Sequence, residues 1–172
     1  PREGIDFFPL SVEYEEKQYA VGKIPGGFNK REGKASEHAT LTSRVIDRPM
    51  RPLFPKDYRN DVTLSNLVMS VDPDCNPEIP AMLGSAIATC ISDIPFDGPC
   101  AATQIGMLDG EFIINPTLGQ KDISDLQLTV ASTRDKVIMI EAGANEIPES
   151  VMIDASFKAH EVNQEIIKFI DQ

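Results

Sequence analysis

The chain has 172 residues, of which 41% are hydrophobic and 25% are charged, an ordinary composition for a globular protein. This composition excludes disorder, collagen and coiled coil for the whole chain, and the length predicts one domain with its own core. The net charge is −11 at pH 7, and no segment has the roughly 18 consecutive apolar residues that a membrane span needs. We expect a soluble, intracellular protein without a signal peptide.

The first half of the chain predicts a strand, a surface loop, a helix and a second strand. Apolar and polar residues alternate over 8–14, as in a half-buried strand, and the glycine-rich segment 22–33 shows no apolar period. Ser36 is placed to cap a helix over 37–47, which Pro49 and Pro52 should end. Alternation returns over 61–71 with a phase change near Asn66, which predicts a strand with a bulge.

The second half predicts a buried helix, two hairpins and a long terminal helix. The run 81–91 is apolar nearly all round, so a helix beginning at Pro77 or Pro80 should be the most buried one. Residues 100–115 and 125–141 each alternate on both sides of a turn, as in hairpins. Apolar residues at helical spacing extend over 149–171. Paired strands with helices inserted between them predict an α+β layered fold with a mixed or antiparallel sheet.

Positive charge is concentrated in one part of this acidic chain. Nine basic and four acidic residues lie between Lys23 and Arg59, whereas Asn60 to Gln120 contains neither Lys nor Arg. Segment 26–31 combines two glycines, Phe28, Lys30 and Arg31, which together offer a ring for base stacking and cations for phosphate. Arg44, Arg48 and Arg51 follow at helical spacing and should share one face. The alternative is that Asp47, Asp57 or Glu32 neutralises these arginines in salt bridges.

Catalytic and metal-binding signatures are missing from the sequence. The chain has no GxSxG, HExxH, Walker or dinucleotide-binding motif, so we assign no catalytic residue. Its three cysteines form no CxxC pair and are expected to be buried free thiols. His38 and His160 are far apart in the sequence and near no other metal-type ligands, so no metal site is expected.

Several longer motifs resemble the polynucleotide phosphorylase family of bacteria, and within it the first ribonuclease-PH-like domain. They are the segments 4–10 (GIDFFPL), 22–28 (GKIPGGF), 31–33 (REG), 46–55 (IDRPMRPLFP), 94–99 (IPFDGP) and 115–117 (NPT). Together they extend through nearly the whole chain, and we expect residues 1–172 to be one partial domain of this type with its long helix near 149–171.

The resemblance implies a nucleotidyltransferase of the transferase class that degrades mRNA from its 3′ end by phosphate attack. It further implies a cytoplasmic homotrimer around an RNA channel, Mg²⁺ and inorganic phosphate as cofactors, and degradosome-type protein partners. The family's aromatic and basic RNA-gripping loop matches Phe28, Lys30 and Arg31. Arg44, Arg48 and Arg51 match family arginines at the channel and at the interface between the two halves, where they would meet RNA or phosphate. Asn29 stands where the family often has a second aromatic residue, so this loop is expected to offer one stacking ring fewer.

In the family, the phosphate site and the metal-binding aspartates belong to a second ribonuclease-PH-like domain. We therefore expect this chain alone to guide RNA and build the ring, without catalysis or bound metal. The family also has strands upstream of Gly4, so the sheet is expected to be truncated and to expose an unpaired edge. Two alternatives remain, a purely structural oligomerisation module and a stand-alone phosphorolytic exoribonuclease.

Overall fold

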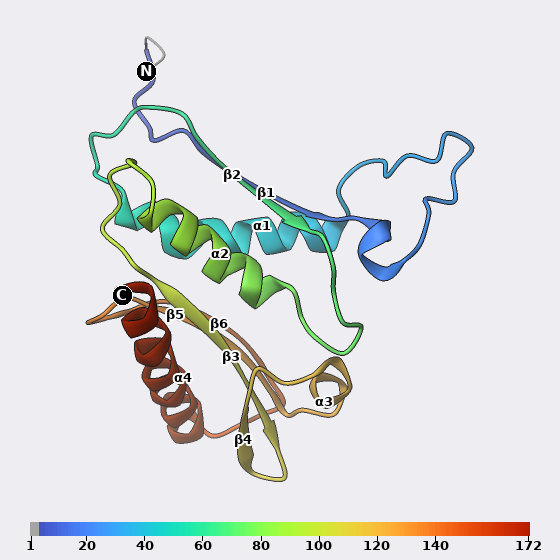
Figure 1. The fold of residues 1–172 in the computed structure, drawn as a ribbon. Coiled ribbons are helices and arrows are strands. Elements are labelled where there is room, and N and C mark those ends of the chain that lie inside the picture. Colours follow the sequence, from blue (N-terminus) through green and yellow to red (C-terminus); the bar gives the residue numbers. More distant parts are fainter. Residues whose placement is uncertain (1–3) are drawn as a thin grey trace.

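Two sheets of different kinds enclose a pair of helices in the computed structural model, which describes residues 4–172 (Figure 1). The first sheet pairs β1 (Leu10–Glu16) with β2 (Val62–Val68), and the second has the order β4-β3-β5-β6. Helices α1 (Glu37–Met50) and α2 (Glu78–Cys90) lie between the sheets. Helix α4 (Glu149–Ile170) covers the other face of the second sheet. The α+β prediction is confirmed.

The connection lengths explain why the two sheets differ. Strands β1 and β2 are parallel, with Leu10 opposite Val62. The connection through α1 returns the chain to the end of the sheet at which β1 began. The second sheet is antiparallel because its strands follow short turns: β3 (Ala101–Leu108) and β4 (Glu111–Ile114) form one hairpin, and β5 (Leu126–Ser132) and β6 (Val137–Ala144) form another. Both predicted hairpins are confirmed.

Strands β3 and β5 of the second sheet are buried on both faces, and each face belongs to a different core. Ala102 and Ala131 face the larger core, which α1, α2, β1 and β2 complete. Leu128 and Val130 face α4, where they pack with Ala155 and Ala159. Successive residues of a strand point to opposite faces, so strand β5 contributes to both cores.

Helix α1 begins at the predicted cap and ends later than predicted. The Ser36 Oγ accepts a hydrogen bond from the Ala39 N–H at 3.0 Å. Pro49 was expected to end the helix, but it lies inside the last turn. A proline there removes one N–H only, and the Arg51 N–H again bonds the Asp47 carbonyl before the short 3-10 helix η2 (Arg51–Leu53).

The bulge predicted near Asn66 is absent, because β1 and β2 pair without a register shift from Leu10–Val62 to Glu16–Val68. Asn66 continues the inward phase of β2, and its Oδ1 accepts a hydrogen bond from Ser85 Oγ at 2.7 Å. The phase change in the sequence reflected a polar residue in an inward position. Leu67 and Met69 point outward and are exposed.

Helix α2 lies between layers as predicted, but only one of its faces is buried. Ile79, Met82 and Ala86 are in the larger core, whereas Gly84 and Ala88 are exposed. The prediction of three buried thiols is also wrong in part: all three cysteines are free, but only Cys100 is buried. No helix of residues 4–172 is long and apolar enough to cross a membrane.

Candidate nucleic-acid interface

The segment 22–34 extends from the body of the protein between the 3-10 helix η1 (Gln18–Val21) and α1 (Figure 1). Phe28, at its turn, has a relative exposure of 101%, which is unusual for an aromatic side chain. Lys30 and Arg31 are exposed as well, and none of the three side chains has a recorded hydrogen bond or ion pair with the described residues. The segment therefore presents a ring and two cations to solvent.

Backbone geometry places these side chains on a turn. The Lys30 N–H donates to the Gly27 carbonyl at 3.0 Å, and Lys30 itself adopts a φ of 51°. A lysine in the left-handed region is uncommon, whereas Gly22 and Gly33 adopt that region at the two ends of the segment without steric cost.

The base of the segment is tied to the rest of the fold by polar contacts. The Glu32 carboxylate accepts a hydrogen bond from the Gln18 N–H at 3.0 Å. Glu32 was a possible partner for the arginines, but its recorded contact is with the backbone. The Lys23 N–H donates to the Gln18 carbonyl at 2.9 Å. Residues on both sides of the turn thus meet at Gln18.

The three arginines after the segment differ in what they contact. Arg44 is exposed and has no recorded partner among the described residues. The Arg48 Nη1 lies 3.7 Å from Glu141 Oε2, and both side chains are at least half exposed, so this ion pair is weak. Arg51 forms a two-pronged pair with Asp47, with N–O distances of 3.0 and 2.7 Å.

Arg51 has further contacts that fix it in the fold. Its guanidinium donates to the carbonyls of Phe8 and Leu10, both at 3.1 Å, and lies 6.0 Å from the centre of the Phe8 ring. These bonds tie the end of α1 to the start of β1. The salt-bridge alternative therefore describes Arg51 well, and its RNA contact stays a prediction.

The six predicted RNA-contacting residues do not form a single cluster. Segment 22–34, which carries Phe28, Lys30 and Arg31, lies beyond the N-terminal end of α1 (Figure 1). Arg48 is eleven positions after Glu37 at the start of that helix, which is a rise of about 16 Å. The loop and the arginines thus form two basic areas, with Arg44 between them.

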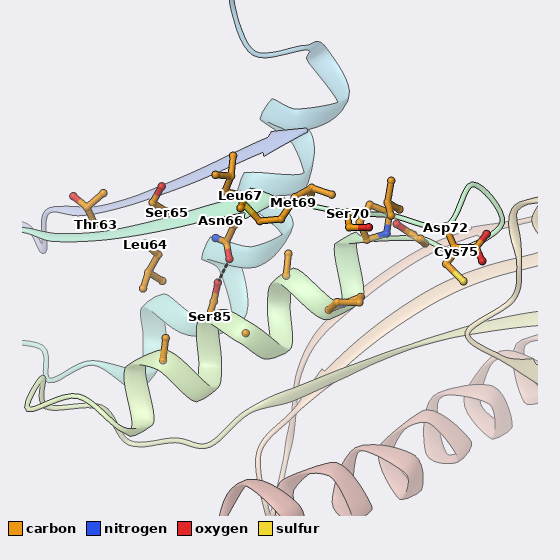
Figure 2. Close-up of a pocket in the computed structure, with 18 residues that line it drawn as sticks. Thr63, Leu64, Ser65, Asn66, Leu67, Met69, Ser70, Asp72, Cys75 and Ser85 are labelled. Atoms are coloured by element: carbon orange, nitrogen blue, oxygen red, sulfur yellow. Dashed lines mark hydrogen bonds between the residues drawn. The ribbon is translucent and has the colours of Figure 1, made fainter. Parts of the chain in front are cut away.

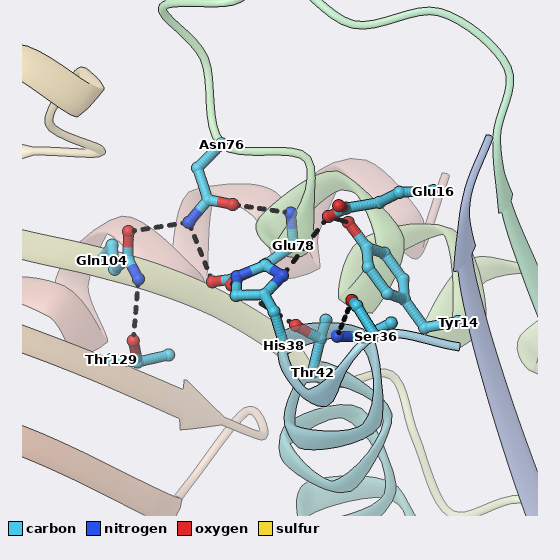
Figure 3. Close-up of polar contacts among 10 residues, drawn as sticks. Tyr14, Glu16, Ser36, His38, Thr42, Asn76, Glu78, Gln104 and Thr129 are labelled. Carbon is cyan, nitrogen blue, oxygen red and sulfur yellow. Dashed lines mark hydrogen bonds and ion pairs between the residues drawn. The ribbon is translucent and has the colours of Figure 1, made fainter. Parts of the chain in front are cut away.

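A polar cluster that the sequence did not predict lies at the base of segment 22–34 (Figure 3). His38, in the first turn of α1, contacts two carboxylates: its Nε2 is 2.8 Å from Glu78 Oε1, and its Nδ1 is 3.5 Å from Glu16 Oε1. These residues come from α1, α2 and the end of β1. No spacing in the sequence could reveal them, because three distant elements bring them together.

Other side chains hold both carboxylates of the cluster. Glu78 accepts hydrogen bonds from Thr42 Oγ1 at 3.3 Å and from Asn76 Nδ2 at 2.8 Å. The Tyr14 hydroxyl donates to Glu16 Oε1 at 2.8 Å. Burial raises the pKa of Tyr14, and the hydrogen bond to Glu16 raises it further, so Tyr14 stays protonated and remains a donor.

The cluster borders a pocket of about 490 Å³ that η1, the start of α2 and Lys121 of α3 (Leu118–Asp122) also line. Burial lowers the pKa of Lys121, and the charge of Glu78 opposes that shift. Cationic and anionic side chains both face this pocket, so its charge selects no single class of ligand.

A larger groove of about 770 Å³ runs along β2 and the exposed face of α2 (Figure 2). Leu67 and Met69 flank it on the strand side, and Gly84 and Ala88 on the helix side. No Lys or Arg lines the groove. Phosphate groups need cationic partners, so this surface does not suit a nucleic-acid backbone.

The described residues offer no site for the Mg²⁺ ion that the resemblance implies. No group of three His, Cys, Asp or Glu side chains within residues 4–172 is arranged to hold a metal ion. These residues therefore do not fit the cofactor, and we derive no step through it.

Comparison with known proteins agrees with the fold and with the resemblance. Residues 1–95 match the model of domain 1 of the 3′ exoribonuclease family, and residues 98–162 match domain 2. The chain is 81% identical over 172 residues to the polyribonucleotide nucleotidyltransferase of Lachnoclostridium phytofermentans and 62% identical to that of Alkaliphilus oremlandii. Both matches include 100% of this chain, but the chain spans only 25% and 24% of the length of these two relatives.

A solved structure of rice (Oryza sativa) Rrp46 superimposes with a TM-score of 0.76 at 14% identity. The match covers 100% of this chain and 76% of that chain, and at this identity it shows the fold alone. The expected resemblance is confirmed by the high identity over the whole chain. Because a family model matches more than half of its residues, the chain belongs to the 3′ exoribonuclease family.

Proposed function

We propose that this chain is part of a polynucleotide phosphorylase, and that its own role is to bind single-stranded RNA. The carrying observation is the segment with Phe28, Lys30 and Arg31, whose side chains are exposed and have no recorded partner among the described residues. An exposed ring beside two cations suits single-stranded RNA, because bases stack on the ring and phosphates pair with the cations.

The whole protein would then shorten mRNA from the 3′ end in the cytoplasm by phosphate attack, releasing nucleoside diphosphates. Mg²⁺ would act in a part of the protein outside this chain, because no group of three metal-type ligands is found within residues 4–172, and phosphate would act with it. A homotrimeric ring would bring the RNA-binding segments of several copies together, and degradosome-type proteins would be its partners. The names and the family of the relatives support the nucleotidyltransferase and 3′ exoribonuclease activity in this proposal.

Arg44 and Arg48 extend the proposed RNA path along α1, because both are exposed and Arg48 has only a weak ion pair. Arg51 enters the proposal differently. Its bonds to Asp47 and to the start of β1 make it a residue that holds the fold beneath this path.

Binding of a labelled oligoribonucleotide at several salt concentrations tests the proposal. We expect affinity to fall steeply with salt, because phosphate contacts release counterions. Arg31→Ala should weaken binding and reduce the salt slope by about one. The matched control is Arg59→Ala, because Arg59 donates to the carbonyls of Lys56 and Tyr58 and lies outside the segment. Equal affinities of Arg31→Ala and the unmodified chain would contradict the proposal.

A structural module is the second candidate, because Arg51, one of the six residues assigned to RNA, is engaged by Asp47 and by the start of β1. It predicts no RNA binding at low salt. A stand-alone exoribonuclease would instead release nucleoside diphosphates when phosphate and Mg²⁺ are added, and we expect no such product from this chain.

A further inference from the structure

Strand β2 has a neighbour on one side only. In the part of the chain that the structure describes, the first sheet consists of β1 and β2 alone. The Val62 N–H donates to the Pro9 carbonyl at 3.1 Å, which sets the phase of the parallel ladder. Alternate residues of β2 then bond to β1, and Thr63, Ser65 and Leu67 direct their N–H and C=O groups away from it. No backbone hydrogen bond from outside the ladder is recorded for these three residues.

The other edge strands among the described residues carry features that discourage pairing. Strand β1 contains Glu13, and on its free side the Leu10 carbonyl accepts a hydrogen bond from Arg51. Strand β4 has four residues and begins with Glu111, and β6 carries Glu141. Strand β2 has neither a charged residue nor a proline. Charges, prolines and short length usually protect the edge of a sheet, so β2 is an unprotected edge.

The groove along β2 has room for the side chains of an added strand. It has a volume of about 770 Å³, and on the α2 side Ala81, Gly84 and Ala88 line it (Figure 2). Neighbouring strands lie about 4.8 Å apart, so a third strand beside β2 would run along this groove. Every second side chain of that strand would point towards α2, where the small residues leave space for it.

The charge around the groove indicates which kind of segment fits. Asp72 lines the groove, and no Lys or Arg does. Segment 60–120, which contains β2 and α2, has eight acidic residues and neither Lys nor Arg. A second copy of the chain would bring the same negative charge to the edge, which disfavours it as the occupant. A segment with Lys or Arg beyond its ends would instead be attracted.

We propose that the free edge of β2 binds an extended segment of a partner protein as a third strand. The segment has apolar residues at alternate positions, which fill the groove, and Lys or Arg beyond its ends, which face Asp72. Backbone hydrogen bonds to Thr63, Ser65 and Leu67 supply affinity, and the alternate side chains supply specificity. The inference does not depend on the proposed RNA-binding role, because segment 22–34 does not line the groove.

Hydrogen exchange of the β2 amides tests the proposal. The probe is a synthetic peptide of about ten residues that alternates Val and Thr and has lysines at both ends. In the free chain, the amides of Thr63, Ser65 and Leu67 should exchange quickly, whereas those of Leu64 and Asn66 are protected by β1. Peptide at about ten times its Kd should slow the first three about tenfold and leave the other two unchanged. Unchanged exchange of the first three up to about 1 mM peptide would overturn the proposal.

A proline variant distinguishes strand pairing from unspecific apolar contact. The Ser65 N–H faces away from β1, so Ser65→Pro removes no bond of the ladder, and proline is tolerated at such positions of edge strands. It should weaken peptide binding about fivefold or more, because one donor to the added strand is lost. Ser65→Ala keeps the N–H and should bind like the unmodified chain. Equal affinities of the two variants, with unfolding midpoints in urea that show both to be folded, would rule out strand addition.

A charge variant tests the chemistry of the partner without altering β2. Asp72→Asn keeps the Oδ1 that accepts from the Asp74 N–H at 3.0 Å and removes only the negative charge. It should weaken the lysine-ended peptide about twofold to threefold, as expected for an exposed pair. Asp154→Asn, at an exposed site on α4, is the control and should have no effect. A peptide with glutamates in place of the lysines should bind the unmodified chain more weakly, and equal binding of the two peptides would contradict a basic partner.

The same amides show whether a second copy of the chain occupies the edge instead. Without peptide, exchange at Thr63, Ser65 and Leu67 should stay fast when the protein concentration is raised, and sedimentation should not change. Exchange that slows with concentration, together with sedimentation of a dimer, would mean that β2 pairs with itself, and the proposal of a partner segment would be wrong.

Discussion

Asn163 is the buried polar side chain that joins α4 to the second sheet, β4-β3-β5-β6. It has a relative exposure of 0%, its Nδ2 donates to the Val130 carbonyl and to Ser132 Oγ, both at 3.0 Å, and its Oδ1 accepts from Thr103 at 2.7 Å. A buried amide that satisfies three partners specifies how the helix rests on the sheet, because any shift would leave polar atoms unpaired.

Replacing Asn163 by alanine should lower the free energy of unfolding by about 2–3 kcal/mol, since it leaves buried groups of Thr103 and Ser132 without a partner. Urea denaturation measures this change. Glu165→Ala, an exposed site on the same helix, should change the value by less than about 0.5 kcal/mol. Equal effects of the two substitutions would mean that the buried amide contributes nothing specific.

Arg51 offers a test of the two roles that the sequence left open for it. Arg51→Ala should cost about 1–2 kcal/mol of stability, because it removes the pair with Asp47 and the bonds to the carbonyls of Phe8 and Leu10. Thermal or urea unfolding gives the cost, and Arg44→Ala is the exposed control. If Arg51→Ala weakens RNA binding at unchanged stability, the RNA role is the correct one.

The candidate site was predictable only where it depended on side chains in one stretch of sequence. Phe28, Lys30 and Arg31 are neighbours, so their exposure could be inferred from the glycines and the missing apolar period around them. The His38 cluster was not predictable, because Glu16 and Glu78 reach the histidine from other elements. The pairing of Arg51 with Asp47 needed only helical spacing and was among the alternatives.

At the scale of elements, the last turn of α4 is held by a contact with the turn between β5 and β6. Arg134 donates to Asp171 through two nitrogens, one at 3.0 Å and one at 2.5 Å, and also to the Gly98 carbonyl at 3.0 Å. The hydrogen bond from Arg134 lowers the pKa of Asp171, with the charge of the guanidinium acting in the same direction. The helix is thus fixed at its C-terminal end as well as at Asn163.

The stabilising effect of this pair should depend on pH in a defined direction. Because its pKa is lower in the folded chain, Asp171 contributes stability above its ordinary pKa of about 4, and this contribution is lost as the pH falls below that value. The urea midpoint of the unmodified chain should therefore exceed that of Asp171→Asn at about pH 6. The two midpoints should converge towards about pH 3. A constant difference between them would contradict the assignment.

Most elements could be predicted because each carries a local signal. Alternation marked β1 and both hairpins, and the Ser36 cap marked the start of α1. One error arose where a tertiary contact decided the outcome. Asn66 stays in the inward phase of β2 because Ser85 of α2 donates to it. The end of α1 was missed for a local reason, because the backbone bond from Arg51 to Asp47 carries the helix past Pro49. The parallel pairing of β1 and β2 also depends on packing over α1 and carries no local signal.

At the scale of the whole molecule, the larger core connects the two parts that separate family models match. Ile46 and Leu64 come from the first part, whereas Ala131 and Met139 come from the second, and all four are buried in one cluster. We therefore propose that residues 1–172 behave as one domain, as the sequence predicted, although the family models divide near residue 96.

A single domain should unfold in one transition, whichever part is probed. Met139→Ala should cost about 2–3 kcal/mol, because it leaves a cavity in the shared core, and should destabilise β1 and β5 equally. Hydrogen exchange of both strands measures this. Met69→Ala, at a site with 65% exposure, is the control. Two separate transitions, or destabilisation of β5 alone, would show two independent units.

The pairing of Leu10 with Val62 also sets an order of events when the chain folds. The hairpins β3–β4 and β5–β6 close over short turns, and such contacts form within microseconds. Strand β1 instead waits until the chain has passed through α1 and reached β2, and closing so long a loop costs entropy before any contact offsets it. During synthesis β1 would leave the ribosome well before its neighbour β2, and it would stay open to a chaperone in the interval.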